Sequence, residues 1–211
     1  MKRNDTVLCP CLCPGSGDPW QVTAARAPGA VPQRFPKGAT IYRQGLPGEG
    51  IFVLCEGSVT LVVSAPGRPR RILDIVAAGQ PFGLDCLAKN RLRRCSAVAR
   101  QDCVACYVSR GQVRATLCAD SELWWNAFAL LAEKLDRVRQ ERLILTGGRL
   151  AEQIESLRRL HAGNGGTAPL RQTEMAALLG VSNESVCRAV KRTRAQGQSQ
   201  APKTAHARSG L

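Results

Sequence analysis

Two oppositely charged side chains stand four residues apart near the C-terminus, Glu184 and Arg188. In a helix this spacing places both on one face. A carboxylate accepts hydrogen bonds and a guanidinium donates two in parallel, so the pair can read base edges: glutamate accepts from cytosine N4, and arginine forks onto guanine O6 and N7. The simpler interpretation is an i,i+4 salt bridge that stabilises the helix by roughly 0.3–0.5 kcal/mol. We favour base contact because of the surrounding sequence.

That sequence, residues 171–194, predicts two short helices joined by a tight turn at Gly180-Val181, with Ser182 as the N-cap of the second helix. The apolar residues expected to face inward are Met175, Leu178, Leu179, Val186 and Val190. The residues left facing outward, as base readers, are Asn183, Glu184, Cys187 and Arg188. The residues expected to hold phosphates are Arg171, Ser182, Lys191, Arg192 and Arg194. The helix pair therefore predicts a helix-turn-helix and double-stranded DNA as its partner.

Composition agrees with an anionic partner. The 211 residues carry a formal net charge of +14, and cations that neutralise phosphates release counterions. No run of about 18 apolar residues predicts a membrane span, and the first residues lack the apolar core of a signal peptide, so we expect a cytoplasmic protein. The only histidines, His161 and His206, fall in an expected loop and tail. No nucleophile–base arrangement is visible, so we expect no enzyme.

Ten cysteines are present, and they fall into three groups. Three are spaced at alternate positions near the N-terminus, in CPCLC. Cys103 and Cys106 form C-x-x-C, but a separation of three along a strand places them on opposite faces, which makes them poor disulfide partners and puts Cys103 in the core. The remaining cysteines lie singly in strand or helix patterns and are expected to be reduced and mostly buried: Cys55, Cys86, Cys95, Cys118 and Cys187.

The order of apolar and polar residues also predicts the strands and helices that position these side chains. Short apolar runs separated by turn signals predict five or more strands in a small antiparallel barrel or sandwich. A helical period follows, with an apolar seam broken only by Arg142 and formed by Trp124, Phe128, Leu131, Leu135, Val138 and Leu145. Such a seam predicts that the helix pairs with its own copy in a homodimer. The alternative is that the stripe packs on its own barrel.

Gly147-Gly148 is expected to end this helix, and a further amphipathic helix follows with Leu150, Ile154, Leu157 and Leu160. The predicted fold class is α+β, a β-barrel followed by helices. Its predicted segments are a flexible Cys/Pro/Gly-rich arm at 1–33, a barrel sensor domain at 34–110, a dimerisation helix at 111–146, a helix-turn-helix domain at 147–195 and a disordered basic tail at 196–211.

Three motifs in the barrel carry a family resemblance: F-x-K-G-A-T-I-Y-x-x-G at 35–45, G-I-F-V-L-x-x-G-x-V at 50–59 and G-x-P-F-G-L-D at 79–85. With the helix pair, they resemble the cyclic-AMP receptor protein and fumarate-nitrate reductase regulator (CRP/FNR) family of bacterial transcription factors over residues 34–194. The resemblance implies a jelly-roll barrel of the cyclic-nucleotide-binding type, a homodimer, binding to DNA and contact with RNA polymerase.

Cyclic nucleotide is disfavoured as the signal. In family members that bind it, a glutamate holds the ribose, whereas Leu84 stands in that place here and cannot accept a hydrogen bond. An arginine and a small hydroxyl residue hold the phosphate in those members, and Arg93 or Arg94 with Cys95 or Ser96 align only loosely with them. We expect Arg91, Arg93 and Arg94 to solvate a barrel edge. A cyclic-nucleotide-responsive regulator remains an alternative.

The G-L-D loop is more similar to the oxygen-sensing branch, whose members ligate an iron–sulfur cluster with cysteines of the arm and barrel. By this resemblance the ligands are Cys9, Cys11, Cys13 and Cys106, the four thiolates that a cubane cluster takes. The branch spaces its arm cysteines more widely, so incidental thiols on a flexible arm are the alternative interpretation. Zinc on the same sulfurs is a weaker one, because its usual spacing is C-x₂₋₄-C. A thiol redox switch is a third variant.

For DNA, the family resemblance implies a half-site that contains TG or TTG, read by Glu184 and Arg188, and Cys187 stands where the oxygen-sensing branch has a serine. The family continues past its recognition helix into a β-wing. Here residues 195–211 are polar, contain proline and show no alternation, so we expect no clear wing. The alternative function is a sensor dimer with a truncated reading head that acts through protein contacts.

Overall fold

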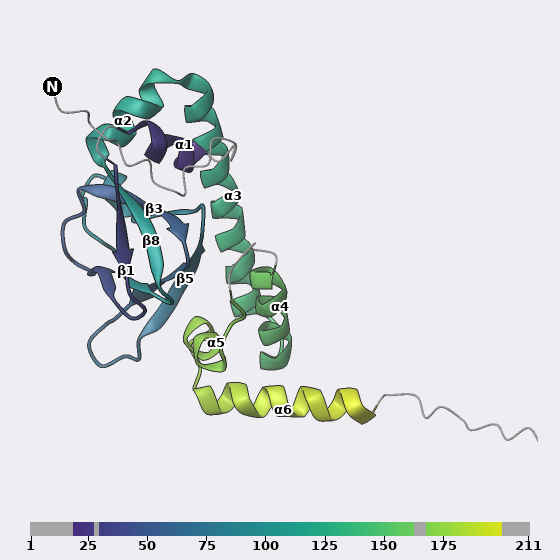
Figure 1. Ribbon diagram of the computed structural model, residues 1–211. Helices are drawn as coiled ribbons and strands as arrows, with labels where there is room; N and C mark the ends of the chain where they lie inside the picture. Colours follow the sequence, from purple (N-terminus) through teal and green to yellow (C-terminus); the bar gives the residue numbers. More distant parts are fainter. Residues whose placement is uncertain (1–18, 28–29, 163–167, 200–211) are drawn as a thin grey trace, which may run out of the picture.

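The computed structural model describes residues 19–27, 30–162 and 168–199. A β-barrel lies at one side of a long helix, and a group of three shorter helices closes the far end (Figure 1). The strands are β1 (Val31–Phe35), β2 (Thr40–Tyr42), β3 (Gly50–Glu56), β4 (Ser58–Val63), β5 (Arg71–Ala77), β6 (Pro81–Phe82), β7 (Ser96–Ala99) and β8 (Cys103–Ser109), with a 3₁₀ turn, η1, at Leu84–Leu87.

The strands form two antiparallel four-stranded sheets, in the orders β1-β8-β3-β6 and β2-β7-β4-β5. The jelly-roll barrel expected from the turn-separated apolar runs is therefore confirmed. The first sheet is covered on both faces. Along β3, Phe52 and Leu54 point into the barrel, and Ile51 and Val53 point out beneath the helices. This alternation follows from the two-residue period of a strand, and it explains why residues 51–54 are all apolar.

The same alternation decides the cysteines of β8. Cys103 lies in the barrel interior and Cys106 on the outer face, both buried. The prediction that they point to opposite faces, with Cys103 in the core, is confirmed. The prediction of buried reduced thiols is confirmed for Cys86 and Cys95. Cys118 is an exposed thiol, Cys187 is a half-buried thiol, and Cys55 is half-buried and disulfide-bonded.

The helices are α1 (Pro19–Arg26), α2 (Arg110–Ala119), α3 (Ser121–Thr146), α4 (Leu150–Ala162), α5 (Gln172–Leu179) and α6 (Asn183–Ser199). The prediction of one continuous helix over 111–146 is wrong, because the helical backbone is interrupted at Asp120. That residue has extended backbone, and its carboxylate accepts hydrogen bonds from the backbone N–H groups of Glu122 and Leu123. An aspartate N-cap starts a new helix there and turns the chain along the barrel.

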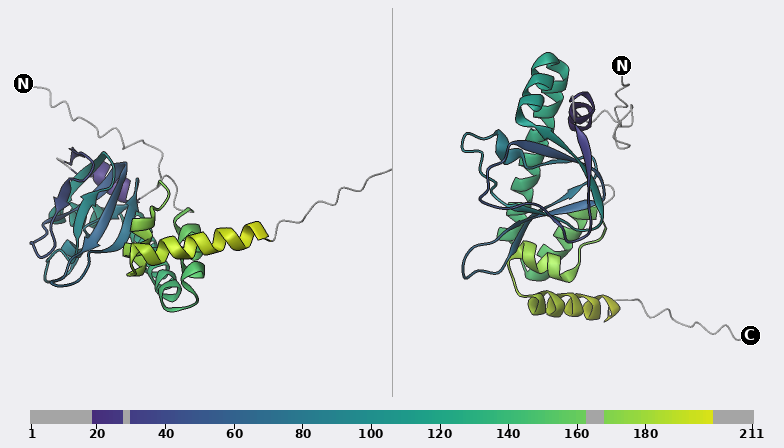
Figure 2. Two further views of the ribbon diagram at one scale, coloured as in Figure 1. Left: turned by 90° about the horizontal axis from the view of Figure 1, so that it is seen from below. Right: turned by 60° about the vertical axis from the view of Figure 1, so that its left-hand side comes forward.

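The structure also corrects the arm that was predicted over 1–33. Residues 19–26 form helix α1, which packs on the outer sheet between α2 and α3 (Figures 1 and 2). Trp20, Thr23, Ala24 and Ala27 are buried at the i, i+3, i+4, i+7 spacing of a helix face. One tryptophan with small neighbours is enough to dock this short helix, because an indole buries a large apolar area.

The three C-terminal helices share a small core formed by Ile154, Met175, Ala176, Val186 and Val190. His161 was predicted in a loop, but it lies in the last turn of α4 and is buried. The tail predicted from 196 overlaps α6, which continues to Ser199, and residues 200–211 lie outside the described part of the chain. The expected lack of a wing concerns residues that lie largely outside the described part of the chain, because that part ends with α6. No helix among the described residues is long and apolar enough to cross a membrane.

Candidate functional site

The loop of the G-x-P-F-G-L-D motif at residues 79–85, called the cradle below, corresponds by resemblance to the nucleotide-binding loop of CRP/FNR family members. Here it holds a buried arginine. Arg93 is 4% exposed and lies with its guanidinium 4.3 Å from the centre of the Tyr42 ring. It donates hydrogen bonds of 2.6 Å to the Gly83 carbonyl, 2.8 Å to Asp85 Oδ1 and 2.6 Å to the Gly50 carbonyl. The prediction that Arg93 solvates a barrel edge is wrong, because its charge is paired inside the barrel.

The backbone around Arg93 is shaped to admit it. A Cβ atom added at Gly48 would lie 2.7 Å from its guanidinium carbon, and one at Gly83 would lie 2.5 Å from a guanidinium nitrogen. Arg91 and Arg94 are exposed, as predicted. Three of the five N–H donors of the Arg93 guanidinium are already used by this carboxylate and these carbonyls.

A second feature of the barrel is a pair of sulfurs on its outer face. Cys55 Sγ lies 3.6 Å from Cys106 Sγ, between neighbouring strands β3 and β8. Burial raises the pKa of the Cys106 thiol, so it is protonated at neutral pH in this environment. The proposed partners Cys9, Cys11 and Cys13 lie outside the described residues. Among the described residues, no group of three metal-ligating side chains occurs.

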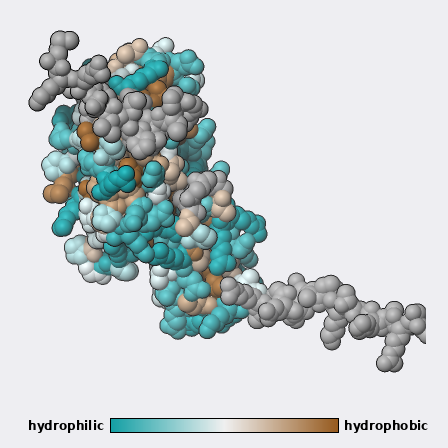
Figure 3. Space-filling model, in the orientation of Figure 1, coloured by the Kyte–Doolittle hydropathy of each residue, from teal (hydrophilic) through white to brown (hydrophobic). Residues whose placement is uncertain are grey.

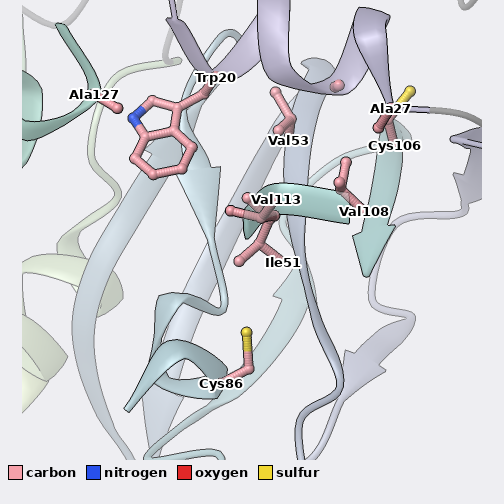
Figure 4. Close-up of a cluster of buried hydrophobic side chains, with 10 residues drawn as sticks. Trp20, Ala27, Ile51, Val53, Cys86, Cys106, Val108, Val113 and Ala127 are labelled. Carbon is pink, nitrogen blue, oxygen red and sulfur yellow. The ribbon is translucent and has the colours of Figure 1, made fainter. Parts of the chain in front are cut away.

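Helix α1 joins this pair to the rest of the molecule. Ala27 lies beside Cys106, and Trp20 lies toward Ala127 of α3 (Figure 4). Arg26, in the last turn of α1, donates to the Asp120 carboxylate at 2.7 Å, at the cap where α3 begins. The outer-face sulfurs and the start of α3 are thus linked through one buried helix that sequence reasoning missed.

A cavity of about 290 Å³ lies between the barrel and α3. Trp20 and Leu73 line it together with the ion pair between Lys134 Nζ and Asp74 Oδ2, 2.9 Å apart. Glu141 lies farther along the same helix, and burial raises the pKa of its carboxyl group. The lining combines apolar and charged side chains, which is the composition of a small-molecule site.

The seam residues of α3 lie on its exposed face. All six predicted members are between 37% and 53% exposed: Trp124, Phe128, Leu131, Leu135, Val138 and Leu145. Trp124 and Phe128 stack with ring centres 5.6 Å apart. Leu123 and Ala127 on the other side of the helix are buried, where α3 packs against α1 and α2. Leu131 and Val138 of the seam also line the cavity between the barrel and α3. The alternative in which the seam packs on its own barrel therefore applies to that part of the stripe, and the rest is left uncovered.

Helix α6 presents the predicted readers to solvent. Ser182 caps it, since its Oγ accepts from the Ser185 backbone N–H at 3.1 Å. Glu184 and Arg188 are exposed, 3.8 Å apart in a loose i,i+4 ion pair. The thiol of Cys187 donates to Gln172 Oε1 of α5 at 2.8 Å. Exposed side chains also include Arg171, Asn183, Lys191 and Arg192, whereas nothing is described of the Arg194 side chain.

One buried ion pair, absent from the sequence predictions, docks these helices on the barrel. Arg100, 8% exposed, follows β7 and forks onto Glu174 of α5 at 2.6 and 2.8 Å. It also donates to the carbonyls of Ala168 and Pro169. Burial opposes ionisation of Glu174, but the hydrogen bonds from Arg100 and the Arg171 backbone lower its pKa below the usual value. The carboxylate therefore stays charged at neutral pH.

Fold and site define a class: a jelly-roll sensor domain, a helix with an uncovered apolar stripe and a helix-turn-helix. A cyclic nucleotide-binding domain model matches residues 32–120. The Cyclic AMP receptor protein of Thermus thermophilus is 30% identical over 156 residues, covering 73% of this chain and 72% of that protein. A CRP-like cAMP-activated global transcriptional regulator of Mycobacterium tuberculosis is 29% identical over 168 residues, 75% of each chain.

The solved structure of FixK2 from Bradyrhizobium japonicum has the same fold, with a TM-score of 0.69 and 21% identity, covering 80% of this chain and 86% of that one. The chain belongs to the CRP/FNR family of transcription regulators. The resemblance given by the barrel motifs and the helix pair is thereby confirmed.

Proposed function

We propose that this protein is a homodimeric regulator that binds DNA through α6 and responds to a redox signal rather than to a cyclic nucleotide. The observation that carries the proposal is the capped helix α6. Its apolar side is buried against α4 and α5, which together with α6 form the reading head, while Glu184 and Arg188 remain exposed and only loosely paired. A pair held at 3.8 Å in solvent is worth little to folding, so both groups are free to take base edges as partners.

The dimer follows from the stripe on α3. Exposed aromatic and aliphatic side chains in a heptad pattern over residues 124–145 of α3 are the surface of a coiled-coil partner. Sedimentation equilibrium tests this with Leu135→Asp, which places a charge in the seam and is expected to give monomers. Leu143→Asp is the matched control, since Leu143 is 72% exposed and lies outside the seam. A monomeric wild-type chain would contradict the dimer.

Cyclic nucleotide is a poor fit to the barrel. Leu84 lies in η1, where it packs against the outer apolar cluster, and it offers no acceptor for a ribose hydroxyl. The buried arginine of the cradle is already paired with Asp85. Isothermal titration with cyclic AMP and cyclic GMP is expected to show no binding. Micromolar binding of either would restore the cyclic-nucleotide alternative.

The redox proposal rests on the sulfur pair and on α1. Cys13 is six residues before Pro19, and an extended chain of that length reaches about 20 Å. Because α1 is fixed against β3 and β8, the arm cysteines start within reach of Cys106. Cys9, Cys11, Cys13 and Cys106 would hold an iron–sulfur cluster. Cys55, which is disulfide-bonded, is not counted among the ligands. A bound cluster supplies oxygen-sensitive redox chemistry.

Helix α1 contacts both the strands that carry Cys55 and Cys106 and the helix that carries the seam. It therefore connects the sulfurs to the proposed dimer interface by direct packing. Anaerobic purification followed by iron and acid-labile sulfide assays tests the cluster. A colourless, iron-free protein would contradict it and leave thiol oxidation as the redox variant. Cys106→Ser is expected to abolish iron binding, and Cys86→Ser, another buried thiol, is the control that retains it.

DNA binding is tested separately. Fluorescence anisotropy on TTGAT-type palindromes, with anaerobic and air-exposed protein, is expected to show specific binding in at least one state. The second candidate is a sensor dimer that acts through protein contacts, favoured by the polar, proline-containing sequence at 195–211, which shows no strand alternation. It would replace the first if neither state distinguishes the palindrome from random duplex.

A further inference from the structure

The turn between β4 and β5 carries a concentration of positive charge that neither the barrel nor the dimer seam uses. Arg68, Arg70 and Arg71 are all exposed. Among the described residues none of the three takes part in a salt bridge. No acidic residue occurs in the chain from Ser58 to Ile72. Three unpaired cations within four residues favour an anionic partner.

The tip of this turn is rigid. Residues 65–68 read Ala-Pro-Gly-Arg, and the Arg68 backbone N–H donates to the Ala65 carbonyl at 3.1 Å. Gly67 has φ 69°, which is the left-handed conformation that a type II turn requires after proline. The turn and Pro69 fix the backbone on both sides of Arg68, so less conformational entropy is lost when its side chain binds a ligand.

The hairpin lies beside the reading head. Strand β5 packs against α5, and the Arg71 guanidinium lies so close to the turn before α6 that a Cβ added at Gly180 would be 2.5 Å from it. A groove of about 360 Å³ runs between barrel and α5, lined by Lys37, Arg70 and Arg171 among others. The acidic residue in this lining, Glu174, is neutralised by Arg100, so the groove keeps a net positive charge.

The views agree that the hairpin and α6 occupy the same end of the molecule (Figures 1 and 2). In the space-filling view, the face visible at this end is predominantly hydrophilic (Figure 3). A duplex seated on the exposed face of α6 would therefore pass the hairpin on the N-terminal side of that helix. Cations at this place meet the phosphate backbone rather than base edges.

We propose that the β4–β5 hairpin is a second DNA-binding element, in which Arg68 and Arg70 hold phosphates that flank the bases read by α6. The inference rests on the proposed function, since it requires α6 to bind a duplex. It supplies from the barrel the backbone contacts that a β-wing would otherwise make. Arg70 and Arg171 line one groove, so the phosphate track continues from the hairpin to the head.

The test compares two double variants that remove the same charge. Arg68→Ser/Arg70→Ser alters the hairpin, and Arg110→Ser/Arg114→Ser alters α2 at the opposite end of the barrel. Binding is measured by anisotropy over a salt series on two palindromic duplexes. One duplex ends at the half-sites, and the other extends about one helical turn beyond each. A random duplex of the longer length reports non-specific binding.

On the longer duplex the hairpin variant is expected to bind at least about tenfold more weakly at moderate salt, because each lost phosphate contact removes about 0.9 from the salt slope and a dimer loses up to four. The loss should be smaller on the short duplex and equal on palindrome and random sequence, since phosphates carry no sequence. The α2 variant should keep the wild-type slope. Circular dichroism melting confirms that both variants fold.

Three results would overturn the inference. The first is a hairpin variant whose salt slope and DNA affinity equal those of the α2 variant, while Arg188→Ala still abolishes specific binding to the palindrome. This result would leave the proposed function intact. The second is unchanged DNA binding with reduced transcription in vitro, which would assign the arginines to a protein partner. The third is a wild-type chain that binds no duplex at any salt concentration, which removes the proposed function as well.

Discussion

The barrel cradle and the recognition helix each place an arginine beside a carboxylate, and they use the pair in opposite ways. In the cradle, Arg93 is buried, makes three hydrogen bonds and lies over an aromatic ring. On α6, Arg188 meets Glu184 at 3.8 Å in solvent, with both side chains more than 60% exposed. The first pair is committed to the fold, and the second is available to a ligand.

The difference teaches that burial, not residue type, decides the role of such a pair. A buried guanidinium that loses its partners leaves an uncompensated charge, so the surrounding structure depends on it. An exposed pair exchanges protein partners for water or nucleic acid at little cost. A cradle filled by its own arginine is thus a structural element, although the same residue types hold phosphates elsewhere in the family.

The largest effect should come from the cradle. Arg93→Ala leaves Asp85 and two carbonyls without their donor and is expected to lower the free energy of unfolding by about 3–5 kcal/mol, measured by urea titration. Arg94→Ala, one residue along and exposed, should change it by less than about 0.5 kcal/mol. Equal effects of the two substitutions would show that burial does not separate these arginines.

The docking pair should rank second. Arg100→Ala removes four hydrogen bonds between barrel and head, but Glu174 is 12% exposed and keeps a bond from the Arg171 backbone. The loss in unfolding free energy is expected to be about 2–3 kcal/mol. Lys134→Ala, which breaks the more exposed bridge to Asp74, should cost less than about 1 kcal/mol. A larger loss for Lys134→Ala would reverse the assignment of the main docking contact.

The exposed pair should affect binding and leave stability alone. Arg188→Ala is expected to weaken binding to a TTG-containing palindrome by about 1–3 kcal/mol, with unfolding free energy unchanged within about 0.5 kcal/mol. Arg159 forms a comparable exposed i,i+4 pair with Glu155 on α4. Arg159→Ala should change neither quantity, and a stability loss confined to Arg188→Ala would make its salt bridge structural.

The smallest effect concerns pH. Burial, followed by the nearby Arg137, lowers the pKa of His161 below 6.5, so the unfolded chain binds the proton more readily than the folded one. Stability from this residue is therefore full above pH 6.5 and declines as pH falls below it, by at most about 1.4 kcal/mol per pH unit. Urea midpoints at several pH values should show a decline that His161→Asn reduces and His206→Asn does not.

Local patterns predicted much of this molecule. The strands, the outward and inward faces of α3, the end of that helix at Gly147 and the cap at Ser182 follow from alternation, periodicity and capping chemistry within a few residues of each site. The missed helix α1 has the same kind of signal, with buried positions at i, i+3, i+4 and i+7, but threonine and alanine make that stripe weak beside a proline-rich arm.

What the sequence by itself determined is the order of parts and the residues on the exposed faces, because one strand or one helix period fixes them. Only the tertiary structure decided that Arg93 is buried, that Arg100 meets Glu174, that Cys55 lies against Cys106 and that the β4–β5 arginines stand beside the reading head. Those contacts join residues from 8 to 109 positions apart along the chain, and they exist only once the sheets and helices have packed.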